Sequence, residues 1–205
     1  SEDVVGVLCN IISEMLVGLG LIETKTYCLI DKETQTKKCN FNADVIELID
    51  PVSKEHNSLK FWLMPGLLSV LKDNRHNEYP QNIFTIGEVF KKNKNNETGV
   101  EESICLCVAL CNQEADFTEA RQRLDYIMRM FDLKYEVKEM SHPSFIDGRA
   151  GGVYIGDKMI AYIGEVSPSV LENFGIEMPV SCFEMNLTEL LNILRNKKHV
   201  KIKQK

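Results

Sequence analysis

The sequence has no long apolar run, although 44% of its 205 residues are hydrophobic. No stretch approaches the roughly 20 consecutive apolar residues that a membrane-spanning helix needs, and no secretory signal pattern opens the chain. We therefore expect no membrane association and a cytoplasmic protein. Because the chain begins at Ser1 and not at a methionine, we also expect a piece of a longer protein or a tagged one.

A disulfide framework and a zinc site are both missing. The seven cysteines are an odd number and include no Cys-x-x-Cys pair, and the four histidines do not have the spacing of metal ligands. Cys105, Cys107 and Cys111 lie in the apolar stretch Ile-Cys-Leu-Cys-Val-Ala-Leu-Cys. There they are predicted to act as small hydrophobic side chains of a buried strand.

An excess of positive charge is also absent. The net charge is −6, whereas affinity for phosphate backbones needs a concentrated basic surface. Basic residues gather only from Lys197 to Lys205, where a solvated tail is the expected structure. The sequence thus predicts one domain over residues 1–196 and a basic tail over residues 197–205.

No motif for a nucleophilic serine or cysteine and no phosphate-binding loop is present. Glu88 and Glu165 each follow a glycine inside an apolar strand. Two carboxylates in one pocket could act as acid and base, or each could bond a backbone amide or an arginine. His142, Asp147 and Arg149 could form a phosphate or carboxylate site, or the arginine could pair with a neighbouring acid. From these residues alone, no catalytic constellation is evident.

Residues 59–74 are the most informative stretch, Leu-Lys-Phe-Trp-Leu-Met-Pro-Gly-Leu-Leu-Ser-Val-Leu-Lys-Asp-Asn. Pro65 fixes its own φ and disfavours helix at the residue before it, and Gly66 permits a sharp turn. Leu67, Leu68 and Leu71 then share one face at helical spacing. A buried extended segment, a turn and a helix are predicted here.

Apolar periodicity predicts an α+β domain in which helices flank a mostly antiparallel sheet. Strands are expected at residues 21–30, 45–49, 83–90, 103–110, 135–140, 150–155, 159–163 and 180–185. Residues 31–42 are expected to form a loop or hairpin tip. Helices are expected at residues 2–20, from residue 67, and at residues 117–132, 168–174 and 187–195. The first helix carries an apolar stripe wider than a surface helix needs.

These stretches, in this order, resemble the C-terminal catalytic-like domain of the phenylalanine–tRNA ligase β chain of the archaeal and eukaryotic type. Residues 50–53 and 59–74 resemble the "NPvs…LR..LlPgLL…N" signature of that family, with Lys60 where arginine is usual. Residues 18–27, 83–90, 142–150, 161–168 and 179–184 resemble its other motifs. The motif residues with expected structural roles are Pro51, Pro65, Gly66, Gly87, Glu88, Arg149, Gly164, Glu165, Pro168 and Glu184.

The resemblance implies a class II aminoacyl-tRNA synthetase-like fold that has lost its chemistry. The second class II motif needs an arginine for the α-phosphate of ATP, and residues 84–90 contain none. The third needs a glycine-rich turn and an arginine, and residues 183–190 have neither. Without guanidinium groups nothing offsets the triphosphate charge. We therefore expect no catalytic residue, metal or cofactor in this chain, whereas the whole ligase would use ATP and Mg²⁺.

The implied role is structural support of the α subunit in a heterotetramer that attaches phenylalanine to its tRNA. This chain would contact tRNA weakly or not at all, and alone it could pair as a homodimer through an exposed helical face. The residues expected at the partner interface are Leu8, Ile12, Met15, Leu19, Leu67 and Leu71. The alternatives are an RNA-binding module that contacts tRNA, and a freestanding synthetase-like paralogue with its own small-molecule ligand.

Overall fold

A seven-stranded sheet in the order β1-β4-β5-β9-β8-β7-β6 forms the centre of the computed structural model, which describes residues 3–51 and 53–203. Neighbouring strands are antiparallel except for β1 and β4, which are parallel. The strands are β1 (Ile22–Glu23), β4 (Gln81–Lys92), β5 (Val100–Cys111), β6 (Glu136–Glu139), β7 (Phe145–Ile155), β8 (Lys158–Val166) and β9 (Val180–Asn186). The predicted α+β class with a mostly antiparallel sheet is confirmed.

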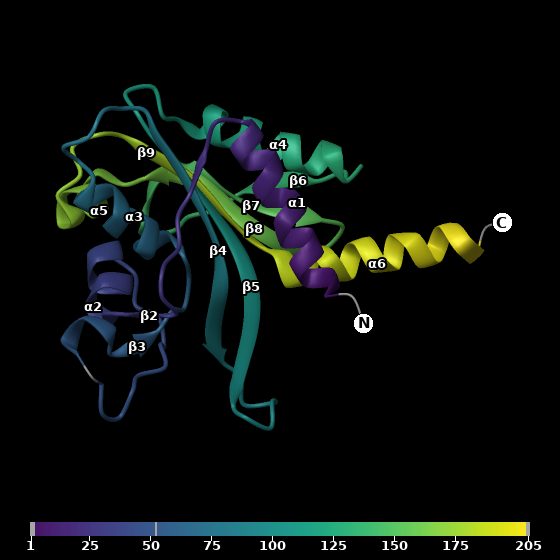
Figure 1. Cartoon of the computed structure of the whole chain (residues 1–205), viewed down its shortest axis with the longest axis horizontal. Helices are drawn as coiled ribbons and strands as arrows, with labels where there is room; N and C mark the ends of the chain where they lie inside the picture. The colour runs from purple at the N-terminus through teal and green to yellow at the C-terminus, as the bar shows by residue number, and fades with distance from the viewer. Residues whose placement is uncertain (1–2, 52, 204–205) are drawn as a thin grey trace.

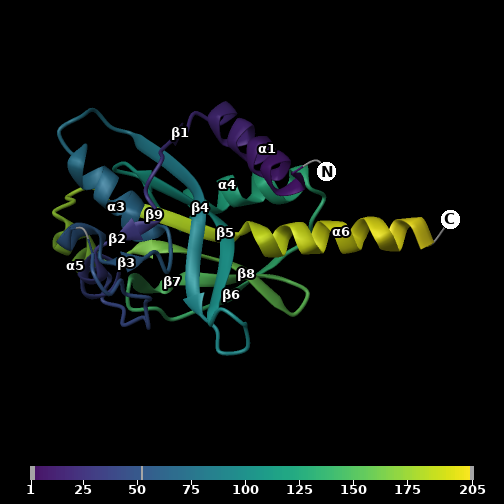
Figure 2. The ribbon, with the colours of Figure 1, turned by 60° about the horizontal axis from the view of Figure 1, so that its bottom comes forward.

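Helices cover both faces of this sheet (Figures 1 and 2). On one face α3 (Met64–Asp73) and α5 (Pro168–Phe174) enclose a core, with the short α2 (Lys32–Gln35) beside α3. On the other face α1 (Val4–Gly18), α4 (Phe117–Met130) and α6 (Leu187–Lys203) enclose a second core. No helix within residues 3–51 and 53–203 is long and apolar enough to cross a membrane.

The central strand β5 explains why both faces must be covered. Cys105, Cys107 and Cys111 point into the core under α3, as predicted, and Leu106 and Val108 point into the core under α1 and α4. All of them are buried. A strand that is apolar on both sides is stable only when helices exclude water from both sides.

Local signals in the sequence place several element boundaries. The Asp116 carboxylate accepts a hydrogen bond from the Glu119 N–H at 2.7 Å and so caps α4, close to the predicted start of this helix at residue 117. Ser167 caps α5, and Gly175 ends it at φ +70°. A turn with Gly156 at φ +61° joins β7 and β8, between the strands predicted at residues 150–155 and 159–163.

The region before α3 differs from the prediction. The expected strand at residues 21–30 is only β1 and β2 (Leu29–Ile30), and β2 pairs with β3 (Ser58–Leu59) in a separate two-stranded sheet. The expected strand at residues 45–49 is reduced to one bridge between Glu47 and Ser58. The expected loop at residues 31–42 contains α2 and a 3₁₀ turn (Lys37–Cys39). These three predictions were wrong, because the chain leaves β4 after two residue pairs and builds a small subdomain.

The predicted boundary between domain and tail falls inside a helix. α6 runs from Leu187 to Lys203 without a break at residue 197, and Figure 2 shows it extending beyond the sheet. Lys197 Nζ bonds the Asp132 carboxylate at 2.8 Å. Residues 204 and 205 of the predicted tail lie outside the described residues.

Gly164 is required by a close approach between β8 and β7. A Cβ atom at this position would lie 2.8 Å from the ring of Phe145 and 3.1 Å from Cβ of Ala150, both of which are buried. We expect Gly164→Ala to lower the free energy of unfolding by about 1–2 kcal/mol, because overpacking forces the ring to move. Urea denaturation measures it. The control is Gly18→Ala, where no atom lies within 4 Å; an equal loss there would contradict the steric explanation.

Candidate functional site

Glu184 joins the central sheet to the start of α3. Its carboxylate, on β9, accepts hydrogen bonds from the Leu63 N–H at 2.9 Å and from the Met64 N–H at 3.0 Å. The Tyr162 hydroxyl donates a third hydrogen bond at 2.8 Å. An anion at a helix N-terminus bonds N–H groups that have no partner within the helix. Pro65 and Gly66 of the family signature lie within the first turn of α3, which begins at Met64, and not in a turn before the helix as predicted. An acid about 120 residues later in the chain holds this helix start in place.

Burial dominates the electrostatics around Glu184. Burial raises the pKa of this carboxyl, while the hydrogen bonds from Leu63, Tyr162 and Met64 act in the opposite direction. The pKa of the Tyr162 hydroxyl is also raised, mainly by its own burial and then by the charge of Glu184. Both Glu184 oxygens are already engaged in hydrogen bonds within the chain. Glu184 therefore acts as a structural anchor.

An aromatic recess lies on the same face of the sheet, over residues of β4, β5, β8 and β9. The cavity has a volume of about 320 Å³, and Phe41, Trp62, His142 and Tyr162 line it together with Glu184. The four rings contact one another; for example, the Phe41 and His142 centroids are 4.6 Å apart. Lys91 at the rim lies 5.0 Å from the centroid of the Phe61 ring. A recess with mostly apolar walls and a single lysine offers little positive charge to compensate that of a triphosphate.

The paired-carboxylate hypothesis for Glu88 and Glu165 was wrong. β5 and β9 separate β4 from β8, and the register places Glu165 in line with Asn82, six residues from Glu88 on β4. The two glutamates are therefore more than about 20 Å apart. Glu165 is buried and bonds the Arg149 guanidinium at 2.7 Å and the Phe117 N–H at 3.0 Å. It thus ties β7 to the first turn of α4, which was the alternative considered. Glu88 is exposed on β4.

His142, Asp147 and Arg149 do not form a site. Arg149 pairs with Glu165, and His142 packs into the aromatic recess against Trp62 and Phe145. Burial lowers the pKa of His142, so the ring is neutral at pH 7. Asp147 is exposed. A neutral imidazole cannot supply the charge that the predicted phosphate site required.

Four of the six predicted interface residues are core residues of this chain. Leu8 and Ile12 of α1, and Leu67 and Leu71 of α3, are at most 5% exposed. Met15 and Leu19 are partly exposed. The prediction that Leu8, Ile12, Leu67 and Leu71 meet a partner was wrong, because the sheet of the same chain covers them. The apolar stripe on α1 is wide, as predicted, but its centre packs against the sheet of the same chain and not against a partner.

One edge of the apolar stripe on α1 is not covered by the rest of the chain. Val4 and Val7 are each 44% exposed, and Ile11 is 40% exposed. Together with Met15 they recur at intervals of three and four residues, so they lie on one side of α1. We call Val4, Val7, Ile11 and Met15 the outer α1 face; Figure 1 shows this helix at the front of the molecule. Beside it, Ile22 of the edge strand β1 is 64% exposed.

The remaining motif residues have structural positions. Pro65 occupies the first turn of α3, Pro168 occupies the first turn of α5, and Pro51 lies exposed in a loop. Gly66 makes room for the Lys60 ammonium, which lies 3.2 Å from the position of an added Cβ. Gly87 lies beside Leu63, 3.5 Å from the same reference position. In residues 3–51 and 53–203 we find no group of three or more acidic, histidine or cysteine side chains that could hold a metal ion.

Sequence reasoning missed three features of this region. Phe41, Trp62 and Tyr162 gave no periodic signal, because each comes from a different segment. The role of Glu184 depends on N–H groups far away in the sequence. Lys60 was noted only as a departure from the family pattern, yet it is 2% exposed. The one signal available was a lysine inside an otherwise apolar run.

Comparison with known proteins identifies the family. The family described as "Phenylalanyl tRNA synthetase beta chain CLM domain" matches residues 7–187. Phenylalanine–tRNA ligase beta subunits from Pyrococcus abyssi and Thermococcus sibiricus are 42% and 39% identical over 180 and 179 residues, which is 87% of this chain and 32% of theirs. The subunit from Methanocella arvoryzae is 38% identical over 187 residues, 89% of this chain and 34% of its own.

A solved structure supports the fold. The pyrrolysyl-tRNA synthetase from Desulfitobacterium hafniense superposes with a TM-score of 0.75 at 20% sequence identity, over 94% of this chain and 70% of that one. The chain spans about a third of the length of the curated relatives it matches. The family match covers most of the chain, including Pro65, Gly66, Arg149, Glu165 and Glu184. The chain belongs to the family of phenylalanyl-tRNA synthetase beta chain CLM domains.

Proposed function

We propose that this chain is a non-catalytic structural domain of the beta subunit of a phenylalanine–tRNA ligase, and that it supports the alpha subunit. The whole ligase would be a cytoplasmic heterotetramer that uses ATP and Mg²⁺ to attach phenylalanine to its tRNA. The observation that carries the proposal is that the Glu184 carboxylate accepts hydrogen bonds from the backbone at the start of α3. On the sheet face that holds the recess, this acid is committed to capping α3.

The charges around the aromatic recess support the absence of adenylate chemistry. Stabilising a transferring phosphoryl group requires preorganised positive groups. The cation that lines the recess is Lys91, which lies against the Phe61 ring. The aromatic side chains of Phe41, Trp62 and Tyr162 pack together there, and Trp62 Nε1 donates to the Gln35 carbonyl oxygen at 3.0 Å. These contacts stabilise the domain and leave little polar surface for a substrate.

The outer α1 face supports the assembly role. Val4, Val7 and Ile11 expose apolar surface on one side of a helix whose other side packs on the sheet. Burying such a stripe against a partner helix would remove apolar area from water. Apolar surface concentrated on one helix is typical of an interaction surface. We assign the alpha subunit as its occupant because the chain belongs to a beta chain family.

Copurification with the alpha subunit from the same organism tests the proposal. We expect the wild-type chain to form a complex on size exclusion, and Val7→Glu plus Ile11→Glu to weaken it at least tenfold. The reason is that two charges would have to be desolvated in an apolar contact. Substitutions at Leu8 or Ile12 cannot serve here, because both are buried and would unfold the chain.

The matched control places the same charges elsewhere on α1. Asn10 and Val17 are exposed and lie away from the outer α1 face, so Asn10→Glu plus Val17→Glu should leave the complex intact. Circular dichroism checks that both double variants are folded. The assembly role fails if the wild-type chain ignores the alpha subunit, or if the two double variants bind equally well.

A further inference from the structure

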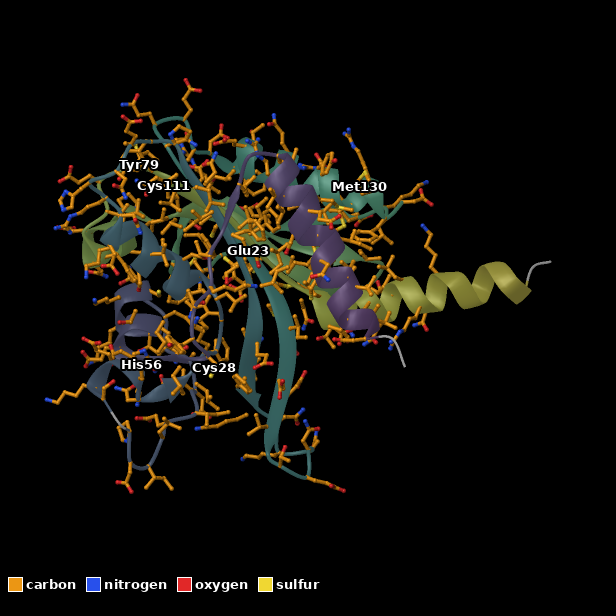
Figure 3. The ribbon with its side chains drawn as sticks, in the orientation of Figure 1. Glu23, Cys28, His56, Tyr79, Cys111 and Met130 are labelled. Carbon is orange, nitrogen blue, oxygen red and sulfur yellow. The ribbon has the colours of Figure 1, made fainter. Side chains whose placement is uncertain are left out.

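A second cavity lies on the open edge of β4, away from the aromatic recess. Its volume is about 300 Å³, and Thr26, Lys60, Leu63, Ile86 and Ile104 are among the residues that line it. We call it the Lys60 pocket. Thr26, Tyr27 and Cys28 form its outer wall, and Figure 3 labels Cys28 at the end of this segment. The pocket exists because the chain pairs with β4 only at Ile22 and Glu23, and the residues that follow do not continue this pairing.

Lys60 brings a nearly buried ammonium group to this pocket. The residue is 2% exposed, and its Nζ donates a hydrogen bond to the Thr26 hydroxyl at 2.5 Å. An ammonium group has three donors. Within the part of the chain that the structure describes, Thr26 is the hydrogen-bond acceptor found for Lys60 Nζ. Buried charges are normally paired or fully hydrogen-bonded, so two donors here still require an acceptor.

The backbone of β4 adds further donors on the same side. The Phe84 carbonyl oxygen accepts from the Thr24 N–H, and the Phe90 N–H donates to the Lys60 carbonyl oxygen. Backbone groups alternate between the two edges of a strand, so the N–H groups of Ile86 and Glu88 also face this edge. Among the described residues 24–28 and 60, none accepts a hydrogen bond from them. Both residues line the Lys60 pocket.

The surroundings restrict the kind of anion that would fit. Leu63, Ile86 and Ile104 provide apolar surface beside the donors. The Glu184 carboxylate acts on Lys60 from β9, and Glu88 lines the pocket, so a dianion would meet uncompensated repulsion. A volume of about 300 Å³ is at the lower end for small-molecule sites. These features favour a single negative charge on a short aliphatic body.

We propose that the Lys60 pocket binds the carboxylate of a short aliphatic acid. The ammonium of Lys60, the hydroxyl of Thr26 and the edge N–H groups of Ile86 and Glu88 hold the carboxylate oxygens. The aliphatic part lies against Leu63, Ile86 and Ile104. This binding is independent of the assembly role, because the pocket does not include the exposed residues of the outer α1 face.

Thermal unfolding of the full chain with sodium butyrate as the probe tests this proposal. At pH 7 we expect butyrate to raise Tm saturably by at least about 3 °C above sodium chloride of equal ionic strength. Inorganic phosphate should have a smaller effect because of its second charge. Lys60→Met should abolish the butyrate effect, and Thr26→Val should weaken it. Lys94→Met, which removes an exposed lysine in the β4–β5 turn, should leave it unchanged.

Two readouts separate binding from a purely structural role of Lys60. In ¹H–¹⁵N spectra of the wild-type chain, butyrate should shift the amide signals of Ile86 and Glu88. This readout does not depend on whether the variants fold. The pKa of Lys60 is lowered to about 8 by desolvation, against the opposing charge of Glu184 and the thiols of Cys28 and Cys107. Because only the protonated form of Lys60 binds a carboxylate, the affinity for butyrate should fall about tenfold for each pH unit above that pKa.

Three results would overturn the proposal. The first is a butyrate effect no larger than that of chloride, with unmoved amide signals. The second is an effect that persists in Lys60→Met. A stronger effect of phosphate than of butyrate would overturn the assignment to a monocarboxylate, because it would show that the site accommodates a second negative charge.

Discussion

Replacing Glu184 with alanine is expected to lower the free energy of unfolding by about 4 kcal/mol. The substitution removes the acceptor for the N–H groups of Leu63 and Met64 and for the hydroxyl of Tyr162. These groups are buried or partly buried, so each loses a partner that water cannot fully replace. The start of α3 also loses the negative charge that its N–H groups attract. The effect should therefore be among the largest of any single substitution in the sheet.

Urea denaturation at pH 7, followed by circular dichroism, measures this loss. Glu184→Gln keeps the shape and one acceptor oxygen, so we expect it to fall between wild type and Glu184→Ala. The control is Glu189→Gln, which removes a more exposed acid paired with Lys158, and which should cost less than about 1 kcal/mol. If Glu184→Ala were no more harmful than this control, Glu184 would not be the anchor of α3.

Elements with a local cause could be predicted from the sequence. The Asp116 cap, the Ser167–Pro168 helix start and the Gly156 turn each depend on side chains within four residues. The long strands β4 and β5 were visible because most of their central residues are apolar. The family resemblance then supplied the arrangement of these elements, which periodicity alone does not contain.

Elements with a distant cause could not be predicted. Residues 21–30 have strand composition. However, the Lys60 N–H donates a hydrogen bond to the Cys28 carbonyl oxygen, and β2 pairs with β3 in a second sheet. α2 escaped notice although Asp31 caps it through the Thr34 N–H, a local signal that was available. The apolar residues at positions 45–49 have too few pairing partners to form a strand, and one bridge to Ser58 is all that results.

The candidate site divides in the same way. The pairing of Arg149 with an acid was foreseen as an alternative, because both residues carried obvious charge. The identity of that acid, and the capping of α3 by Glu184, required the strand order. The interface prediction shows the limit most clearly. A sequence reveals how wide an apolar stripe is, but only the packed structure shows that Leu8 and Ile12 face inward while Val7 and Ile11 face outward.

Lys60→Met is expected to change how stability depends on pH. The pKa of Lys60 is about 8 in the folded chain against an ordinary value of 10.5, because burial disfavours the ammonium. Between these values the unfolded chain binds more protons, so wild-type stability should rise with pH through this window. The full shift corresponds to about 3 kcal/mol, of which about 2 kcal/mol should appear between pH 7 and pH 9.5.

The measurement is the difference in unfolding free energy between wild type and Lys60→Met at several pH values, since other groups also titrate in this range. At pH 7 the methionine variant should be as stable as wild type or more stable, because an apolar side chain replaces a poorly paired buried charge. This advantage should shrink as the pH rises. Lys94→Met, on the surface, should show no such trend. A constant difference would mean that Lys60 is well solvated or fully paired, and the need for an anion beside it would disappear.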